Sequence, residues 1–133
     1  MIEPARIHVR FSDLDVLGHV NNSIYLSYFE IARVHYFAEL LGTDWDWNKN
    51  GVLLVKNEVE YFKPIVLHDA PHVHVFLEHV GEKSFTLSYE IKVNDTLHTK
   101  GKSVLVCFDA SKNATIPINP VMKEALNQLK PEQ

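Results

Sequence analysis

Residues 21–41 constrain the fold most, because they predict one long helix that is apolar around most of its circumference. The segment has no proline and no internal glycine, opens on Asn21 or Asn22 as a capping residue, and ends at Gly42. Its polar residues are spaced by three or four and share one restricted strip that could face a wet interface or a ligand: Ser23, Ser27, Glu30 and Arg33. Because apolar residues cover the rest of the surface, this helix must be buried on several sides.

Strand-like segments, in which apolar and polar residues alternate, account for most of the remaining chain. They are residues 5–12, 52–63, 72–80, 84–93 and 97–108. Asn94 and Asp95 predict a tight turn between the last two segments, and a short helix from Asn119 or Pro120 to Leu129 closes the chain. This order predicts an α+β fold in which an antiparallel five-stranded sheet packs against one long helix.

The apolar surface of the long helix exceeds what one such sheet can cover. A sheet of this size covers one face of the helix, so the remaining surface predicts a second subunit. The minimal assembly is a homodimer with two-fold symmetry. Whether such dimers pair further into a homotetramer is left open by these residues.

The composition excludes several classes of function. The 133 residues suit a single domain spanning 1–133. The net charge of -4, with scattered Lys and Arg, offers no footprint for nucleic acid. No apolar run has the length of a signal peptide or a bilayer span, so we expect a cytoplasmic protein without membrane insertion. Cys107 is the only cysteine and is interpreted as a small core residue of a buried strand.

Residues 13–22, Asp-Leu-Asp-Val-Leu-Gly-His-Val-Asn-Asn, place two carboxylates directly before the predicted helix. The first N–H groups of a helix lack intrahelical acceptors and form a positive pocket. Gly18 permits a left-handed bend and the close approach of a ligand. Asp13 and Asp15 can fold back over that pocket, where a carboxylate beside free N–H groups suits hydrolysis of an acyl group.

The same residues also allow a purely structural interpretation. Aspartate and asparagine before a helix are common capping residues, and Gly18 is a common turn residue. Local chemistry alone therefore leaves capping and catalysis open as alternatives.

A longer match bears on this choice. Residues 10–33, RFSDLDVLGHVNNSIYLSYFEIAR, resemble the signature of the hotdog-fold acyl-CoA thioesterases, in particular the 4-hydroxybenzoyl-CoA thioesterase-like branch, and that of the plant acyl-ACP thioesterases. The shared pattern is an aromatic residue with two aspartates, then Gly-His-Val-Asn-Asn, then Tyr-x-x-Tyr-Phe-Glu-x-x-Arg. The resemblance implies a hotdog fold, in which an antiparallel five-stranded sheet wraps around one long central helix, and hydrolysis of acyl thioesters.

The resemblance also implies roles for individual residues. Asp15 matches the catalytic carboxylate, and Asp13 matches a structural or supporting residue. The backbone N–H that polarises the thioester carbonyl matches that of Asn22. In the acyl-ACP branch the positions of His19 and Asn21 also serve the site, so both are catalytic candidates in this chain.

Further candidates for substrate binding lie in the loop, on the helix and at a strand end. Gly18 and Tyr25 are close in sequence to the predicted catalytic residues. Lys83 and Ser84 match a segment that holds CoA phosphates in the family. Glu82 stands where a basic residue would help more, because a carboxylate repels phosphate.

The acyl pocket is expected between two subunits. From the partner, the strand at 52–63 would line it, and Asn57 and Glu58 are the polar residues of that strand that could reach it. Trp45 and Trp47 either line an acyl pocket or cover the edge of the core, and the sequence does not decide.

Two other groups of residues are given structural interpretations. His72 and His74 share one face of a strand, but spacing places no third ligand, so no metal site is predicted. Glu30 is interpreted as an ion-pair partner of the residue three positions further on rather than as a catalytic acid.

We therefore predict an acyl-CoA thioesterase that hydrolyses a fatty or aromatic acyl-CoA to the free acid and CoA, with Asp15 as nucleophile or general base. No cofactor is predicted, and CoA is part of the substrate. Two alternatives stay open. One is hydrolysis of thioesters carried on acyl carrier protein, and the other is a non-catalytic acyl-CoA binding module in which Asp15 only caps the helix.

Overall fold

Alternating side chains build the four long strands of the protein. The computed structural model describes residues 2–131 and gives these strands as β2 (Gly51–Tyr61), β3 (His72–Val80), β4 (Ser84–Val93) and β5 (Thr96–Asp109). In β4 every second residue, from Phe85 to Val93, is buried. The predicted bounds of β3 and β4 are confirmed, and those of β2 and β5 are confirmed to within one or two residues.

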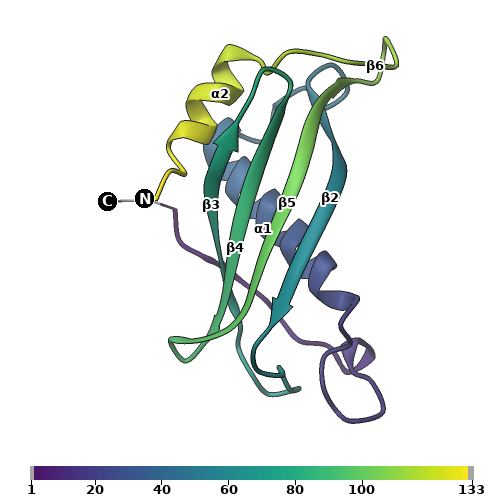
Figure 1. Cartoon of the computed structure of the whole chain (residues 1–133), viewed down its shortest axis with the longest axis vertical. Helices are drawn as coiled ribbons and strands as arrows, with labels where there is room; N and C mark the ends of the chain where they lie inside the picture. Colours follow the sequence, from purple (N-terminus) through teal and green to yellow (C-terminus); the bar gives the residue numbers. More distant parts are fainter. Residues whose placement is uncertain (1, 132–133) are drawn as a thin grey trace.

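These strands join into one antiparallel sheet in the order β1-β3-β4-β5-β2, so β2 is an edge strand (Figure 1). The predicted turn between β4 and β5 is confirmed, because Asn94 and Asp95 have φ angles of 50° and 65°, as a tight hairpin turn requires. A two-residue strand, β6 (Ala114–Thr115), pairs with the end of β5 and was not predicted. The predicted antiparallel α+β class is confirmed.

The first predicted strand, residues 5–12, is wrong beyond its first two residues. Only β1 (Ala5–Arg6) pairs with β3, although burial still alternates as far as Val9. The chain then bends into a 3-10 turn, η1 (Phe11–Asp13), because the Asp13 carboxylate accepts a hydrogen bond from the backbone N–H of Arg10 at 3.0 Å. Alternation reports which side chains face the core, and here it continues where strand pairing stops.

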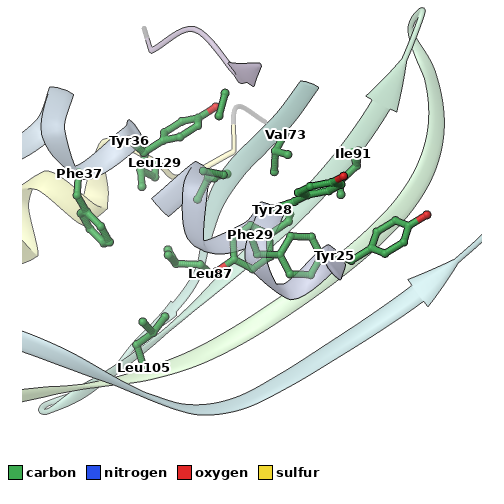
Figure 2. Close-up of a cluster of buried hydrophobic side chains, with 14 of the residues drawn as sticks. Tyr25, Tyr28, Phe29, Tyr36, Phe37, Val73, Leu87, Ile91, Leu105 and Leu129 are labelled. Carbon is green, nitrogen blue, oxygen red and sulfur yellow. The ribbon is translucent and has the colours of Figure 1, made fainter. Parts of the chain in front are cut away.

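The long helix, α1 (Ile24–Leu41), begins two to three residues later than predicted and ends at Gly42 as predicted. Its aromatic residues pack on the concave face of the sheet (Figures 1 and 2). Phe29 stacks on Tyr89 of β4 with ring centroids 4.2 Å apart and planes at 7°. Gly101 of β5 lies directly beneath, and a β-carbon there would collide with the Phe29 ring.

The sheet covers only part of α1. On the helix, Ile31 and Val34 stay 48% and 66% exposed, and on the neighbouring edge strand β2, Leu54 and Val55 stay 48% and 63% exposed. This agrees with the expectation that one sheet leaves apolar helix surface uncovered. Among residues 2–131, no helix is long and apolar enough to cross a membrane.

The C-terminal helix, α2 (Pro120–Asn127), closes the core beside β3 at the end of the sheet where α1 finishes (Figure 1). Asn119 caps it, since its side chain accepts a hydrogen bond from the N–H of Val121 at 2.8 Å. Its own side chains Met122 and Leu126 are buried in the core.

Candidate active site

Asp13 anchors the segment that precedes α1. Its side chain is 1% exposed, and Oδ2 accepts hydrogen bonds from the Tyr28 hydroxyl at 2.7 Å and from the Arg10 N–H at 3.0 Å. The Arg10 guanidinium donates to Oδ1 at 3.1 Å. Burial alone would raise the pKa of Asp13, but these hydrogen bonds outweigh burial and hold the pKa below its usual range. Asp13 is thus a buried, fully bonded carboxylate, which agrees with the supporting role expected of it.

Residues 14–20 form a small closed loop. Leu14 pairs with Val20, and the Asp15 N–H donates to the His19 carbonyl at 2.8 Å. At the tip, the Gly18 N–H donates to the Asp15 carbonyl at 3.0 Å, and Gly18 has a φ of 77°. The predicted left-handed bend at Gly18 is confirmed, and only glycine adopts this conformation without strain.

The Asp15 carboxylate is held by its own loop. Oδ1 accepts hydrogen bonds from the N–H groups of Leu17 at 2.9 Å and His19 at 3.3 Å. Oδ2 has no hydrogen-bond donor anywhere in residues 2–131, and the residue is partly exposed. A carboxylate with one oxygen fixed and one oxygen free can remove a proton from water or attack a carbonyl carbon.

Asn21 caps the turn that leads into α1, whereas Ser23, which directly precedes the helix, makes no side-chain cap bond to it. The Asn21 Oδ1 accepts hydrogen bonds from the N–H of Ser23 at 3.0 Å and from the Ser23 hydroxyl at 2.8 Å. Its carbonyl accepts the N–H of Ile24 at 2.9 Å. The backbone N–H of Asn22, between these bonded groups, has no acceptor within the described part of the chain. It is therefore available to a ligand at the mouth of α1.

Tyr61, at the end of β2, contacts Asn22 and Tyr25 at the start of α1. Its hydroxyl donates to the Asn22 carbonyl at 2.8 Å. Its ring meets the Tyr25 ring edge-on, with centroids 4.9 Å apart. Tyr25, expected to bind substrate, is 2% exposed and lies in the core (Figure 2). The sequence analysis missed Tyr61, whose only signal was an aromatic residue near the end of an alternating strand, shortly before Pro64.

The chain that follows β2 ties the loop to the sheet. The Val20 N–H donates to the Ile65 carbonyl at 2.8 Å, and His19 pairs with Val66. The imidazole of His19 is partly exposed and makes no hydrogen bond to any described residue. The structure thus gathers five of the predicted residues in one loop at the helix mouth: Asp15, Gly18, His19, Asn21 and Asn22.

The remaining predicted residues lie elsewhere in this protomer. Asn57 faces α1 and accepts a hydrogen bond from the Ser103 hydroxyl at 2.6 Å. Glu58 points to the opposite, outer face of the sheet, where Lys56 pairs with it at 2.8 Å. Lys83 and Ser84 lie at the β3–β4 connection, at the other end of the sheet from Asp15 (Figure 1).

A cavity of about 570 Å³ lies in the seam between α1 and β2, towards the C-terminal end of α1. Val34, Phe37, Trp47 and Leu54 line it with apolar surface, and Arg33 and Glu30 add one cationic and one anionic side chain. Trp47 therefore lines a pocket, whereas the half-buried Trp45 donates its indole N–H to the Asn50 carbonyl at 3.0 Å. No group of three His, Cys, Asp or Glu that could hold a metal ion occurs within residues 2–131.

An antiparallel sheet curled around one long helix is the architecture of the hotdog fold. The family model of the thioesterase-like superfamily matches residues 9–126. The chain belongs to this superfamily, and the predicted fold and family are confirmed.

Three similar proteins stand out. The long-chain acyl-CoA thioesterase FadM of Escherichia coli is 30% identical over 93% of this chain and 96% of its own. The uncharacterized protein YsmA of Bacillus subtilis is 32% identical over 63% of this chain, and this chain spans only 56% of YsmA. A Thermus thermophilus thioesterase, solved with coenzyme A and zinc, is 33% identical, with a TM-score of 0.83 over 98% of this chain and 96% of that one.

Proposed function

We propose that this protein hydrolyses acyl-CoA thioesters to the free acid and CoA at the loop of residues 13–22. The observation that carries the proposal is the Asn22 N–H, which lacks an acceptor among residues 2–131, in the same loop as the free Oδ2 of Asp15. The similarity to FadM over nearly the whole chain supports a CoA thioester as substrate. The acyl chain preference and the physiological role stay outside the proposal.

In the proposed reaction, the thioester carbonyl oxygen accepts a hydrogen bond from the Asn22 N–H. Negative charge develops on this oxygen when the carbonyl carbon is attacked, so the N–H stabilises the transition state more than the bound ester. As general base, Asp15 removes a proton from the attacking water, the C–S bond then breaks, and the proton passes to the CoA thiolate. As nucleophile, Asp15 attacks the carbonyl carbon, the C–S bond breaks to give a mixed anhydride and the CoA thiolate, and water then hydrolyses the anhydride to the free acid and the Asp15 carboxylate while its remaining proton passes to the thiolate.

This chemistry uses a carboxylate and a backbone amide, so we propose no cofactor beyond the CoA of the substrate. We further propose a cytoplasmic location. The single cysteine, Cys107, supports it as a buried free thiol, and burial raises its pKa to about 11, which keeps it protonated and unreactive.

We propose a homodimer in which the β2 strands of two subunits pair across their free edges. The support is the exposed apolar surface that β2 and α1 share, since an unpaired apolar edge strand invites pairing. In a two-fold antiparallel pair centred on the middle of β2, the first residues of one β2 strand would lie beside the last residues of the partner's β2 strand. Because Tyr61 holds Asn22, the partner's Asn22 would then lie over the first residues of β2, which border the seam cavity.

The same pairing would account for the distant predicted residues. Lys83 and Ser84 lie at the end of the sheet where β2 begins, so the partner's Asp15 would approach them. The seam cavity of one subunit would receive the acyl group bound at the catalytic loop of the other. A homotetramer built from such dimers stays a prediction.

The decisive experiment measures hydrolysis of a panel of acyl-CoA esters, from aromatic to long-chain, by the wild-type protein and by Asp15→Asn. We expect kcat/KM to fall by a factor on the order of 10²–10⁴ in Asp15→Asn. The matched control is Asp44→Asn, the same change in an exposed loop, which should retain the wild-type rate. Label in the Asp15 carboxylate after a single turnover in heavy-oxygen water would identify a nucleophile, because water that attacks the aspartyl carbon of the anhydride leaves its oxygen there and a general base never acquires it.

Three results would contradict parts of the proposal. A wild-type protein that binds CoA esters but hydrolyses none would be a binding module. Full activity in Asp15→Asn would leave thioester hydrolysis intact but remove Asp15 from it. Faster hydrolysis of the same acyl group on acyl carrier protein would reassign the substrate, so that thioester belongs in the panel.

Dimerisation is tested by sedimentation of Val55→Lys, which should shift the protein to monomers and abolish activity while Asp15 is intact.

A further inference from the structure

Arg33 is a nearly buried cation whose charge has little compensation. Its side chain is 10% exposed. One nitrogen, Nη1, donates to the Tyr89 hydroxyl at 3.1 Å. The nearest carboxylate, Glu30, lies 3.9 Å from Nη2 and is itself 71% exposed. The ion pair that the sequence predicts is therefore long and open to solvent, and such pairs contribute little.

Tyr89 fixes where the guanidinium of Arg33 points. The Tyr89 side chain is 1% exposed and is clamped by its stacking on Phe29. Its hydroxyl also contacts Ser103 in the interior of the sheet. A guanidinium carries five N–H donors in a rigid plane and accepts no hydrogen bonds. With Nη1 held by Tyr89, the N–H groups on Nε and Nη2 have no hydrogen-bond acceptor within residues 2–131.

Those free donors border a cavity whose walls are mostly apolar, although Glu30 and Thr43 also line it. The seam cavity of about 570 Å³ has the size of a small-molecule site and is walled by Val34, Phe37, Trp47 and Leu54. An unpaired charge near such surface costs free energy unless an acceptor reaches it. Mostly apolar walls with a few placed polar groups are typical of a small-molecule site, and among the charged groups here only the Arg33 guanidinium is both nearly buried and oriented by a buried partner.

We propose that Arg33 selects acyl groups that carry an oxygen acceptor, a carboxylate, hydroxyl or keto oxygen, at a position remote from the thioester. The apolar walls hold the hydrocarbon part, and the free N–H groups of Arg33 hold the oxygen. This inference rests on the proposed thioester hydrolysis, in which the acyl group enters the seam. It adds the substrate class, because an unsubstituted acyl chain would leave the guanidinium unpaired.

The test uses three CoA esters of equal chain length: octanoyl-CoA, its terminally hydroxylated analogue, and the corresponding dicarboxylic monothioester. Benzoyl-CoA and 4-hydroxybenzoyl-CoA form an aromatic pair. We expect the wild-type protein to favour an oxygenated ester in at least one pair by about tenfold or more in kcat/KM. The hydroxyl and carboxylate esters separate a neutral acceptor from an anionic one.

Variants then assign the preference to the guanidinium. Arg33→Met keeps an unbranched apolar stem and removes every donor, so the ratio of kcat/KM for oxygenated over plain esters should fall about tenfold. Arg33→Lys keeps the charge and should retain part of the ratio for the carboxylate. The matched control is Arg6→Met, on the exposed strand β1 at the far edge of the sheet, which should leave the ratio unchanged.

The outcomes separate this inference from the proposed function. A wild-type protein that hydrolyses all the esters without preference, or an Arg33→Met variant that loses activity equally on both members of each pair, overturns the role of Arg33 alone. If nothing is hydrolysed, the proposed function fails. Titration of the corresponding free acids, followed by tryptophan fluorescence, then still tests whether Arg33→Met weakens binding of the oxygenated acid more than that of the plain acid. Equal binding would overturn the inference on this second readout too.

Discussion

Removing the Tyr28 hydroxyl should destabilise the protein by an amount that the geometry at Asp13 sets. The hydroxyl donates to Oδ2 of Asp13 at 2.7 Å, and the two residues are 2% and 1% exposed. A buried hydrogen bond to a charged group contributes about 1.5–3 kcal/mol. Tyr28→Phe keeps the ring and its packing, and Asp13 keeps its hydrogen bonds from Arg10. We therefore expect a loss of about 2 kcal/mol in the free energy of unfolding.

The loss should depend on pH, because Asp13 must be ionised to accept these bonds fully. The folded protein holds the pKa of Asp13 below its ordinary value of 3.8, so the unfolded state binds more protons in acid. The stabilisation by ionised Asp13 is present above that ordinary value and is lost as the pH falls through the lower, folded pKa. The difference in stability between wild type and Tyr28→Phe should therefore be largest near neutral pH and should narrow as the pH falls below 3.8.

Urea unfolding at equal protein concentrations, followed by circular dichroism at several pH values, measures this difference. The control is Tyr36→Phe, a buried tyrosine of the same helix whose hydroxyl meets the neutral backbone of Val75. Its cost should be about 1 kcal/mol and should change little in acid. A loss below about 0.5 kcal/mol in Tyr28→Phe, or a loss that is the same at neutral pH and in acid, would refute the account of Asp13 as a charged anchor.

Three further changes test the loop and the helix packing. Gly18→Ala forces a residue with a β-carbon into the left-handed backbone conformation. The free energy of unfolding in urea should fall by about 1–2 kcal/mol, although the space around Gly18 is empty. An unchanged stability would show that the loop relaxes freely. Gly101→Ala drives a β-carbon into Phe29 and should cost about 1–3 kcal/mol or more by the same assay. Tyr61→Phe removes the hydrogen bond to the Asn22 carbonyl and should lower kcat on acyl-CoA esters about tenfold, with little change in the circular dichroism spectrum. A variant with the wild-type kcat would argue against a role of Tyr61 in positioning Asn22.

Much of the fold could be predicted from local pattern, because each strand of the sheet buries one of its two faces. The alternation around Phe85 gives β4 its observed bounds, since burial and pairing coincide there. Near Val9 burial and pairing separate, because the side chain of Asp13 bends the backbone away from β3. Alternation therefore locates faces reliably and strand ends less well.

Residues whose role depends on a distant partner were harder to predict. Local spacing predicts the ion pair of Arg33 with Glu30, which is present at 3.9 Å, but it gives no sign of the shorter hydrogen bond from Arg33 to Tyr89, 56 residues away. Tyr61 acquires its role only when the end of β2 reaches the start of α1, 39 residues earlier in the chain. No periodicity encodes such contacts, because they arise from the curvature of the sheet around the helix.

The loop of residues 13–22 shows why capping and catalysis are hard to separate from sequence alone. Asn21 does cap: its side chain takes the N–H of Ser23, and its carbonyl takes the N–H of Ile24. Asn21 makes no hydrogen bond to the N–H of Asn22, which has no acceptor among residues 2–131. The Tyr61 hydroxyl donates a hydrogen bond to the carbonyl of the same residue. A cap that bonded the Asn22 N–H would complete the helix end and leave no donor for an oxyanion. The hydrogen bonds of Asn21 are those that the structural interpretation expects, and their position leaves the N–H of Asn22 free for the role that we propose for it.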